Sequence, residues 1–153
     1  MSFDVMITGA GAVGAHAVEY LARRPEITRI CLIDRDGPRA EGIAWRATLG
    51  ALQEGRHVRI DAHGLDLSDS AALAEVIART KPRTLFHAAT MISVPEMARG
   101  LPPEVFERIR SAGMGGFLAA HLALGLSVQK ALGLAGHNCS FITAPFPDFA
   151  NQV

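Results

Sequence analysis

The residues best suited to chemistry are three glycines near the start of the chain. They occur in the run Gly9-Ala-Gly-Ala-Val-Gly14, which follows a short apolar segment at 3–8 and opens a segment of helical spacing. A glycine turn between a buried strand and a helix exposes backbone N–H groups at the positive end of the helix dipole, where an anion binds well. The spacing predicts a diphosphate-binding turn: Gly9 allows the tight turn, Gly11 a close approach of the ligand, and Gly14 tight packing of helix on strand.

An acidic residue follows at the spacing that a dinucleotide site requires. Asp34 ends the apolar run 29–34, and it comes 20 residues after Gly14. A carboxylate at the end of the second strand accepts hydrogen bonds from the adenosine ribose and repels a 2′-phosphate. We therefore expect a nicotinamide dinucleotide, with NAD favoured over NADP, although Arg35 is placed to bind the additional phosphate of NADP. The alternative is a plain strand-to-helix turn with a solvated aspartate.

The elements around these residues alternate between strand and helix. We expect strands at 3–8, 29–34, 57–62, 84–87 and 140–143, and helices at 15–24, 38–54, 69–80 and 103–134, with a long loop before the last helix. Such alternation is typical of a parallel sheet covered on both faces. The sequence predicts an α/β doubly wound Rossmann fold, with three αβα layers and about five strands in the order 3-2-1-4-5. A ligand crevice would lie where the order reverses, between the first and fourth strands.

Composition limits the class of protein. The chain has 153 residues, of which 49% are hydrophobic, and 15 Lys and Arg balance 15 Asp and Glu. This length is typical of one domain with its own core, and zero net charge argues against nucleic acid as a partner. The six histidines lack the clustered spacing of metal ligands, so we expect no metal site.

The expected location and assembly follow from the cysteines and the apolar segments. Cys31 and Cys139 lie in apolar runs, as buried thiols do, which favours a reducing, cytoplasmic setting. The start of the chain lacks the basic segment of a signal peptide. The most apolar stretch, 114–128, is shorter than the ~20 residues of a membrane span, so no membrane partner is expected. We expect this stretch to be buried in the domain or in a homodimer formed through 104–134.

Two further segments resemble a known family. Asp66-Leu-Ser-Asp69 and Lys81-Pro-Arg-Thr-Leu-Phe-His-Ala-Ala89, continuing into Thr90-Met-Ile-Ser-Val-Pro-Glu-Met97, are similar to the extended short-chain dehydrogenases/reductases, especially the nucleotide-sugar dehydratases and epimerases. The resemblance covers roughly residues 3–120. It implies that Asp66 and Leu67 border the adenine and that Ala88 and Ala89 lie at the middle of the cofactor. The complete expected cofactor site is Gly9, Gly11, Ala12, Val13, Gly14, Asp34, Arg35, Asp66, Leu67, Ala88, Ala89 and Thr90.

The catalytic residues of that family are absent from this chain. The family uses a Tyr-x-x-x-Lys pair, whereas the single tyrosine, Tyr20, is followed four residues later by Arg24. A weaker similarity to the lactate and malate dehydrogenases lies in Leu32-Ile-Asp-Arg-Asp and Ala144-Pro-Phe-Pro-Asp148, where Ala144 replaces an asparagine that helps to position substrate. Both families place their decisive residues beyond the position of Val153.

These resemblances imply an NAD(P)-binding domain over residues 1–153. We expect it to be the N-terminal part of a longer oxidoreductase-type protein that acts on a small molecule, with catalytic residues outside this chain. The alternative is a non-catalytic dinucleotide sensor. His87, at the end of the fourth strand, is interpreted as satisfying a local hydrogen bond rather than as a ligand-binding group. Arg99 is interpreted as solvated, with contact to a substrate anion as the alternative.

Overall fold

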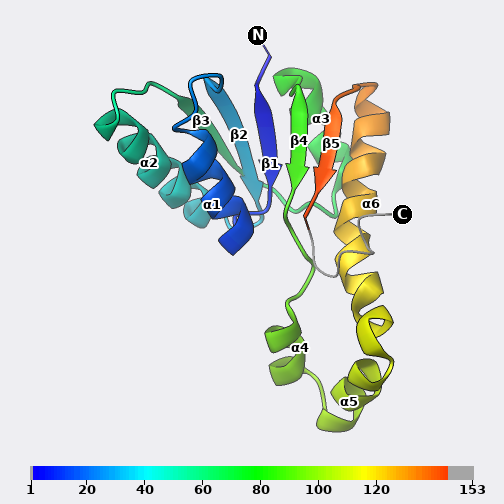
Figure 1. Cartoon of the computed structure of the whole chain (residues 1–153). Helices are drawn as coiled ribbons and strands as arrows, with labels where there is room; N and C mark the ends of the chain where they lie inside the picture. The colour runs from blue at the N-terminus through cyan, green and yellow to red at the C-terminus, as the bar shows by residue number, and fades with distance from the viewer. Residues whose placement is uncertain (1, 145–153) are drawn as a thin grey trace.

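A five-stranded parallel sheet forms the centre of the protein. The computed structural model describes residues 2–144. Its strands are β1 (Val5–Thr8), β2 (Arg29–Asp34), β3 (Arg59–Gly64), β4 (Thr84–His87) and β5 (Ser140–Thr143). They pair in parallel in the order β3-β2-β1-β4-β5 (Figure 1), which confirms the predicted topology. Thr8 pairs in register with Ile33 on one side and His87 on the other, so these strands end at one common edge.

Helices pack on both faces of the sheet, although those of the described residues leave the front of β4 and β5 uncovered (Figure 1). One face carries α1 (Ala12–Leu21) and α2 (Gly37–Gln53), and the other carries α3 (Ser70–Thr80) and α6 (Leu118–Ala135) (Figure 1). The core is accordingly divided into two clusters. Ile7 and Leu32 belong to the cluster under α1 and α2, and Met6 and Ile33 to the cluster under α3 and α6. Because β1 and β2 are buried on both faces, their sequences are continuously apolar.

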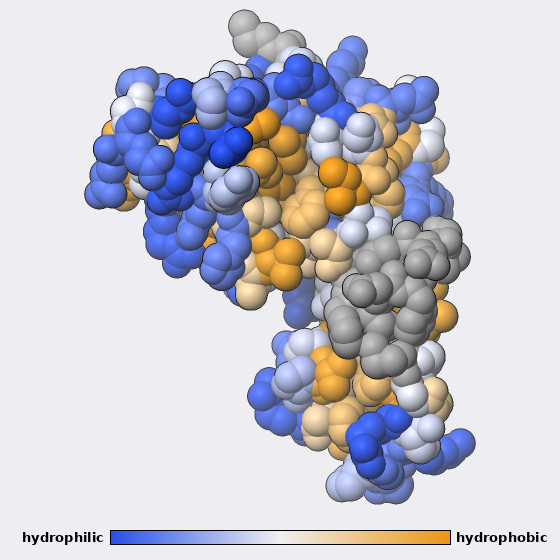
Figure 2. Space-filling model, viewed as in Figure 1, coloured by the Kyte–Doolittle hydropathy of each residue, from blue (hydrophilic) through white to orange (hydrophobic). Residues whose placement is uncertain are grey.

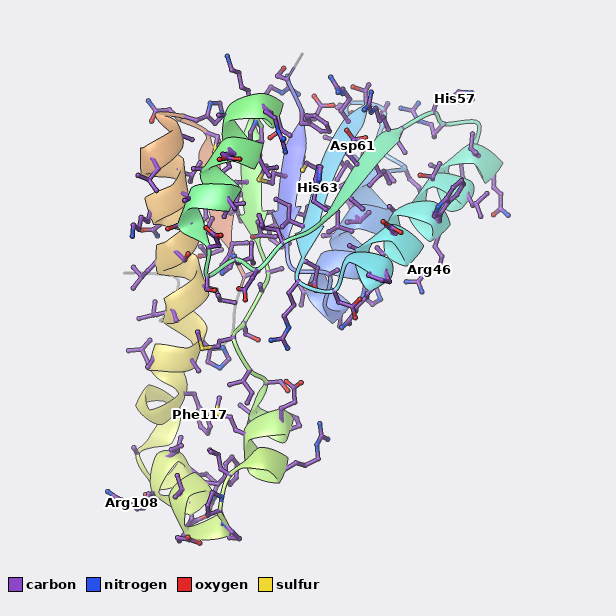
Figure 3. All side chains as sticks on the ribbon, turned by 180° about the vertical axis from the view of Figure 1, so that it is seen from behind. Arg46, His57, Asp61, His63, Arg108 and Phe117 are labelled. Carbon is purple, nitrogen blue, oxygen red and sulfur yellow. The ribbon has the colours of Figure 1, made fainter. Side chains whose placement is uncertain are left out.

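The third strand differs from its expected position. It runs over 59–64 rather than 57–62 and pairs with β2 from Arg29↔Arg59 to Asp34↔Gly64. β3 lies at the edge of the sheet, and Asp61 and His63 point away from the side that packs on α2 (Figure 3). A half-exposed edge strand carries polar residues, which in sequence resemble those of a loop. The sequence pattern therefore does not mark the end of β3 at Gly64.

An arm, which we define as residues 91–117, replaces the expected long loop and the first part of the expected long helix. It contains α4 (Val94–Gly100), α5 (Pro103–Ser111) and a 3₁₀ turn, η1 (Gly113–Phe117). The helix predicted over 103–134 is interrupted because Gly113 has φ +68°, in the left-handed region. Phe106 and Phe117 pack together inside the arm, with ring centroids 6.5 Å apart.

The arm projects beyond the carboxyl edge of the sheet and is connected to the rest of the molecule by the segment that follows β4 and by α6 (Figure 1). Phe117 points into the arm, whereas Arg108 lies at its outer side (Figure 3). Apolar side chains gather in the arm and over the front of β4 and β5 (Figure 2), where Ile142 is 50% exposed. By length and composition, Gly115–Ala135 is sufficient to cross a membrane, in contrast to the shorter stretch considered above. In this structure Val128 and Ala131 of that helix are fully buried in the core under α3.

Candidate functional site

The glycine turn opens directly into α1. Gly11 is the N-cap residue, with an extended backbone, and no side chain in the described range caps the helix. The first intrahelical hydrogen bond is donated by Ala15 N–H to the Gly11 oxygen at 2.8 Å. The N–H groups of Ala12, Val13 and Gly14 precede this bond, so the helix leaves them free for an anionic ligand.

Two of the three glycines are required by close contacts. Gly9 has φ +102°, and a Cβ there would lie 2.7 Å from the backbone nitrogen of Ala89. A Cβ at Gly14 would overlap the carbonyl oxygen of Gly9. At Gly11, by contrast, a Cβ would meet nothing within 4 Å, since this position faces open space. The turn is therefore packed from behind and from the side, and open where a ligand would approach.

Asp34 has a structural role that the sequence did not indicate. Its Oδ2 accepts a hydrogen bond of 2.6 Å from Ala10 N–H, and its Oδ1 accepts one of 2.9 Å from Asp36 N–H. The carboxylate thus fixes the glycine turn to the end of β2. Because each carboxylate oxygen has two lone pairs, acceptor capacity remains for ribose hydroxyls.

The loop after β3 forms the second side of the site. Ser68 N–H donates to Asp66 Oδ1 at 2.9 Å, and this bond, with a smaller contribution from the Arg35 charge, holds the pKa of Asp66 below its usual value. Leu67 is buried, and its carbonyl oxygen accepts a 2.6 Å hydrogen bond from Ser127 Oγ of α6. This contact, which no sequence pattern indicates, holds the loop against α6.

These segments enclose a cleft of about 670 Å³ at the carboxyl edge of the sheet, beside the arm. Its size is that of a small-molecule site. Every residue expected to hold the cofactor lines the cleft except Gly14, which is buried behind the turn. Sequence reasoning did not place these lining residues in the site: Arg39, Ser68, Met91, Ser93, Glu96, Leu124 and Ala144. Most of them lie in the arm or on α6. Arg99, the arm residue for which the sequence suggested contact with a substrate anion as an alternative, also lines the cleft.

Charges of both signs line the cleft. Ser93 donates to Glu96 Oε2 from its N–H at 2.8 Å and from its hydroxyl at 2.6 Å, forming a capping box at the start of α4. These bonds lower the pKa of Glu96, and the nearby charges of Arg35 and Arg99 lower it further. Arg35, Asp66 and Glu96 all line the cleft, and the Arg35 charge lowers the pKa of both carboxyl groups.

His87 lies beneath the cleft and not in its wall. The imidazole is fully buried, its Nδ1 lies 2.8 Å from Thr8 Oγ1, and its ring stacks on Phe141. The contact with Thr8 is the local hydrogen bond that the sequence interpretation assigned to His87, and it involves one of the two ring nitrogens. Burial lowers the pKa of His87 to about 4. Within residues 2–144, His87 Nε2 and both ring nitrogens of the buried His121 have no hydrogen-bond partner.

No metal centre accompanies the cleft in the part of the chain that the structure describes. Within residues 2–144, no three His, Cys, Asp or Glu side chains are grouped closely enough to hold a metal ion. What the site offers is an uncapped helix N-terminus, an acidic strand end and a mixed-charge wall.

Comparison with known proteins places this site in a family. Residues 5–99, more than half of the chain, match the profile described as the saccharopine dehydrogenase NADP binding domain. The chain belongs to this family. It is thus a nicotinamide-dinucleotide-binding domain of the oxidoreductase type, as the glycine turn and Asp34 predicted. The matched range includes every expected cofactor residue and ends within α4.

Individual relatives cover very different lengths. The chain is 42% identical over 81 residues to the spectinabilin polyketide synthase system protein NorA' of Streptomyces orinoci, a match that spans 52% of this chain and 2% of that protein. Among solved structures, the malate dehydrogenase of Picrophilus torridus is 22% identical with a TM-score of 0.66, over 96% of this chain and 39% of that one. The UDP-glucose-4-epimerase of Stenotrophomonas maltophila is 16% identical with a TM-score of 0.62, over 92% and 36%.

The solved relatives support the fold of this NADP-binding-domain family member. They include both an epimerase and a malate dehydrogenase, the two groups that the sequence resembled. The chain spans less than two-fifths of the length of each of these two structures. At these identities the likeness concerns the Rossmann fold itself, and function must be argued from the site.

Proposed function

We propose that the cleft binds NAD in an extended conformation across the carboxyl edge of the sheet. The diphosphate would lie on the N–H groups of Ala12 and Val13, and the adenosine ribose on Asp34. Asp66 and Leu67 would border the adenine, and Ala88 and Ala89, followed by Thr90, would lie at the middle of the cofactor. The observation that carries this proposal is the meeting of an uncapped helix N-terminus and an acidic strand end in one cleft.

The preference for NAD rests on Asp34. Its carboxylate would lie beside a 2′-phosphate and repel it, and the hydrogen bonds from Ala10 and Asp36 keep the carboxylate at the strand end. The opposing feature is the pair Arg35 and Arg39, which line the same cleft and offer charge to a phosphate. One aspartate thus favours NAD and two exposed arginines favour NADP, so the affinities for the two cofactors must be measured.

Calorimetric titration with NAD and with NADP tests both statements. Asp34→Ala is expected to weaken NAD binding by about ten- to a hundredfold, because a charge-assisted contact to ribose is lost. Asp34→Asn keeps an acceptor for Ala10 N–H and separates the lost charge from the loosened turn. Glu104→Gln, on the exposed side of α5, is the matched control and should leave binding unchanged. Unaltered NAD affinity in both Asp34 variants would remove this residue from the site, and tighter binding of NADP by the natural chain would refute the preference.

In this proposal the chain orients the cofactor and does not complete the reaction. A bound nicotinamide supplies hydride chemistry, toward a secondary alcohol or ketone in the enzymes that this sequence resembles. Tyr20 is 63% exposed on α1, with the Arg24 guanidinium 5.4 Å from its ring centroid, so it cannot serve as the catalytic tyrosine of those enzymes. We expect NADH binding without turnover by residues 1–153. NADH oxidation by this chain with simple ketones would contradict that expectation.

The proposed setting is reducing and cytoplasmic. Both cysteines are free thiols, and burial raises the pKa of Cys31 to about 12, which keeps it protonated and unreactive.

A further inference from the structure

The outer face of α2 carries an apolar stripe formed by Trp45, Leu49 and Leu52. Their exposed fractions are 69%, 55% and 44%. Spacings of four and three residues align these side chains along one side of the helix. Glu41, four residues before Trp45, lies on the same side, so the distance from Glu41 to Leu52 is about three helical turns. Trp45 is the only tryptophan in the chain. Three large apolar side chains in line on a surface helix typically mark a contact site.

The stripe is separate from the core and from the cleft. The opposite side of α2 packs onto the sheet through Ala40, Ile43, Ala47 and Ala51. α2 lies at the outer side of the molecule over β2 and β3, with Arg46 at its exposed side (Figures 1 and 3). None of the three stripe residues lines the cleft. Neither folding nor the proposed cofactor site therefore accounts for these exposed side chains.

We propose that the stripe is the interface of a homodimer, in which the α2 helices of two copies pack antiparallel about a two-fold axis near Leu49. Such an interface must be self-complementary, because each residue meets the partner's copy of its counterpart. Antiparallel packing about Leu49 brings Trp45 of one copy against Leu52 of the other, twice. The largest side chain thus meets a smaller one at both ends of the contact.

Charge supports this register. Antiparallel pairing places Glu41, one turn before Trp45, opposite the residues that follow the end of the partner helix, where Arg56 lies. Within the described range, neither Glu41 nor Arg56 is in an ion pair. Two other charged residues of this region are already in ion pairs. Arg46 lies 3.4 Å from Glu19 of α1, and Glu54 lies 2.8 Å from Arg23, which follows the end of α1. On the stripe side of α2, the described charges outside ion pairs are therefore Glu41 and Arg56, which are of opposite sign and lie at opposite ends. Arg39, the other unpaired charge of α2 in the described range, lines the cleft instead.

The other exposed apolar helix is less suited to self-association. The outer face of α6 exposes Leu126 (50%) and Leu134 (60%), within the 104–134 region first expected to dimerise. Lys130, also exposed, is the only charged residue of α6. Two copies packed through this helix would bring like charges together with no acidic partner from the helix. We therefore assign the homodimer interface to α2 rather than to α6.

Sedimentation velocity over a range of concentrations tests the proposal on the chain of residues 1–153. The natural chain is expected to associate reversibly to a dimer, and Leu49→Glu to shift it to monomer by placing two carboxylates at the axis. Leu126→Glu on α6 is the matched control and should leave the dimer intact. Trp45 provides a second readout, since its emission should move to longer wavelength as dilution exposes it. Far-UV circular dichroism of each variant establishes that the fold is kept.

Charge exchange tests the register. Glu41→Arg and Arg56→Glu should each weaken the dimer by about tenfold, since each replaces two symmetry-related attractions by repulsions. Combining them should restore the natural affinity. A monomer at every concentration would overturn the proposal, as would dissociation by Leu126→Glu with Leu49→Glu unaffected. Failure of the double variant to recover would overturn the antiparallel register.

Discussion

Acidification should destabilise this domain through His87. The imidazole is fully buried, and burial lowers its pKa from 6.5 to about 4. In the unfolded chain the ring takes up a proton near its ordinary pKa, whereas in the folded chain it stays neutral to much lower pH. The unfolded state therefore binds more protons between these two values. The contribution of the neutral ring to stability is complete above pH 6.5 and is lost as the pH falls toward 4.

The size of the effect follows from the two pKa values. Each unit of difference is worth about 1.4 kcal/mol, so the complete loss is about 3 kcal/mol, of which about 2 kcal/mol falls between pH 7 and pH 5. Burial also lowers the pKa of His121, which acts in the same direction. The pKa values of Asp4 and Asp66 are lowered from 3.8, so these carboxylates titrate below this interval.

Urea denaturation at pH 7 and pH 5 provides the measurement. The natural chain should lose about 2 kcal/mol or more of unfolding free energy between the two conditions. His87→Gln, which keeps a polar group near Thr8 but cannot titrate, should lose about 2 kcal/mol less than the natural chain over the same interval. His57→Gln, at an exposed position, is the control. Equal losses in the natural chain and in His87→Gln would refute the reasoning.

Three further outcomes are expected from contacts described above. Gly14→Ala should destabilise the domain by about 2 kcal/mol or more in urea denaturation and abolish NAD binding in titration, because the new Cβ overlaps the Gly9 oxygen. Ser127→Ala should lower stability by about 1 kcal/mol through loss of the bond to the Leu67 carbonyl, with Ser111→Ala as the control. Arg99→Gln should weaken the binding of ADP more than that of adenosine, because Arg99 lines the cleft and its positive charge favours the diphosphate; equal effects on both ligands in titration would contradict this role.

The strand order and the glycine turn could be predicted because their signals are local. Buried parallel strands read as apolar runs, and Gly9 and Gly14 are required by contacts within a few residues or across one neighbouring strand end. Asp34 could be placed by its spacing, and the comparisons agree with the cofactor class that it indicated. Its second role, fixing the turn through Ala10 N–H, depends on three-dimensional geometry that spacing alone does not provide.

The arm could not be predicted in the same way. Ser93 and Glu96 do form the sequence pattern of a capping box, but the helix that follows ends within two turns, and the nearby prolines resemble those of a loop. The contact of Ser127 with Leu67 joins residues 60 positions apart, so no local pattern reveals it. For the same reason no local pattern indicates that the arm lines the cleft.

The continuity of α6 has a mechanical consequence. The helix receives a hydrogen bond from Met91 N–H at the Ala120 oxygen, close to the arm, and donates one from Ser127 to the loop beside the proposed adenine position. A single continuous helix therefore contacts both the start of the arm, at Met91, and the loop that carries Leu67. In the proposed complex, a shift of α6 that follows the arm would also move Leu67, so the position of the arm and the binding of adenine would be coupled through this helix.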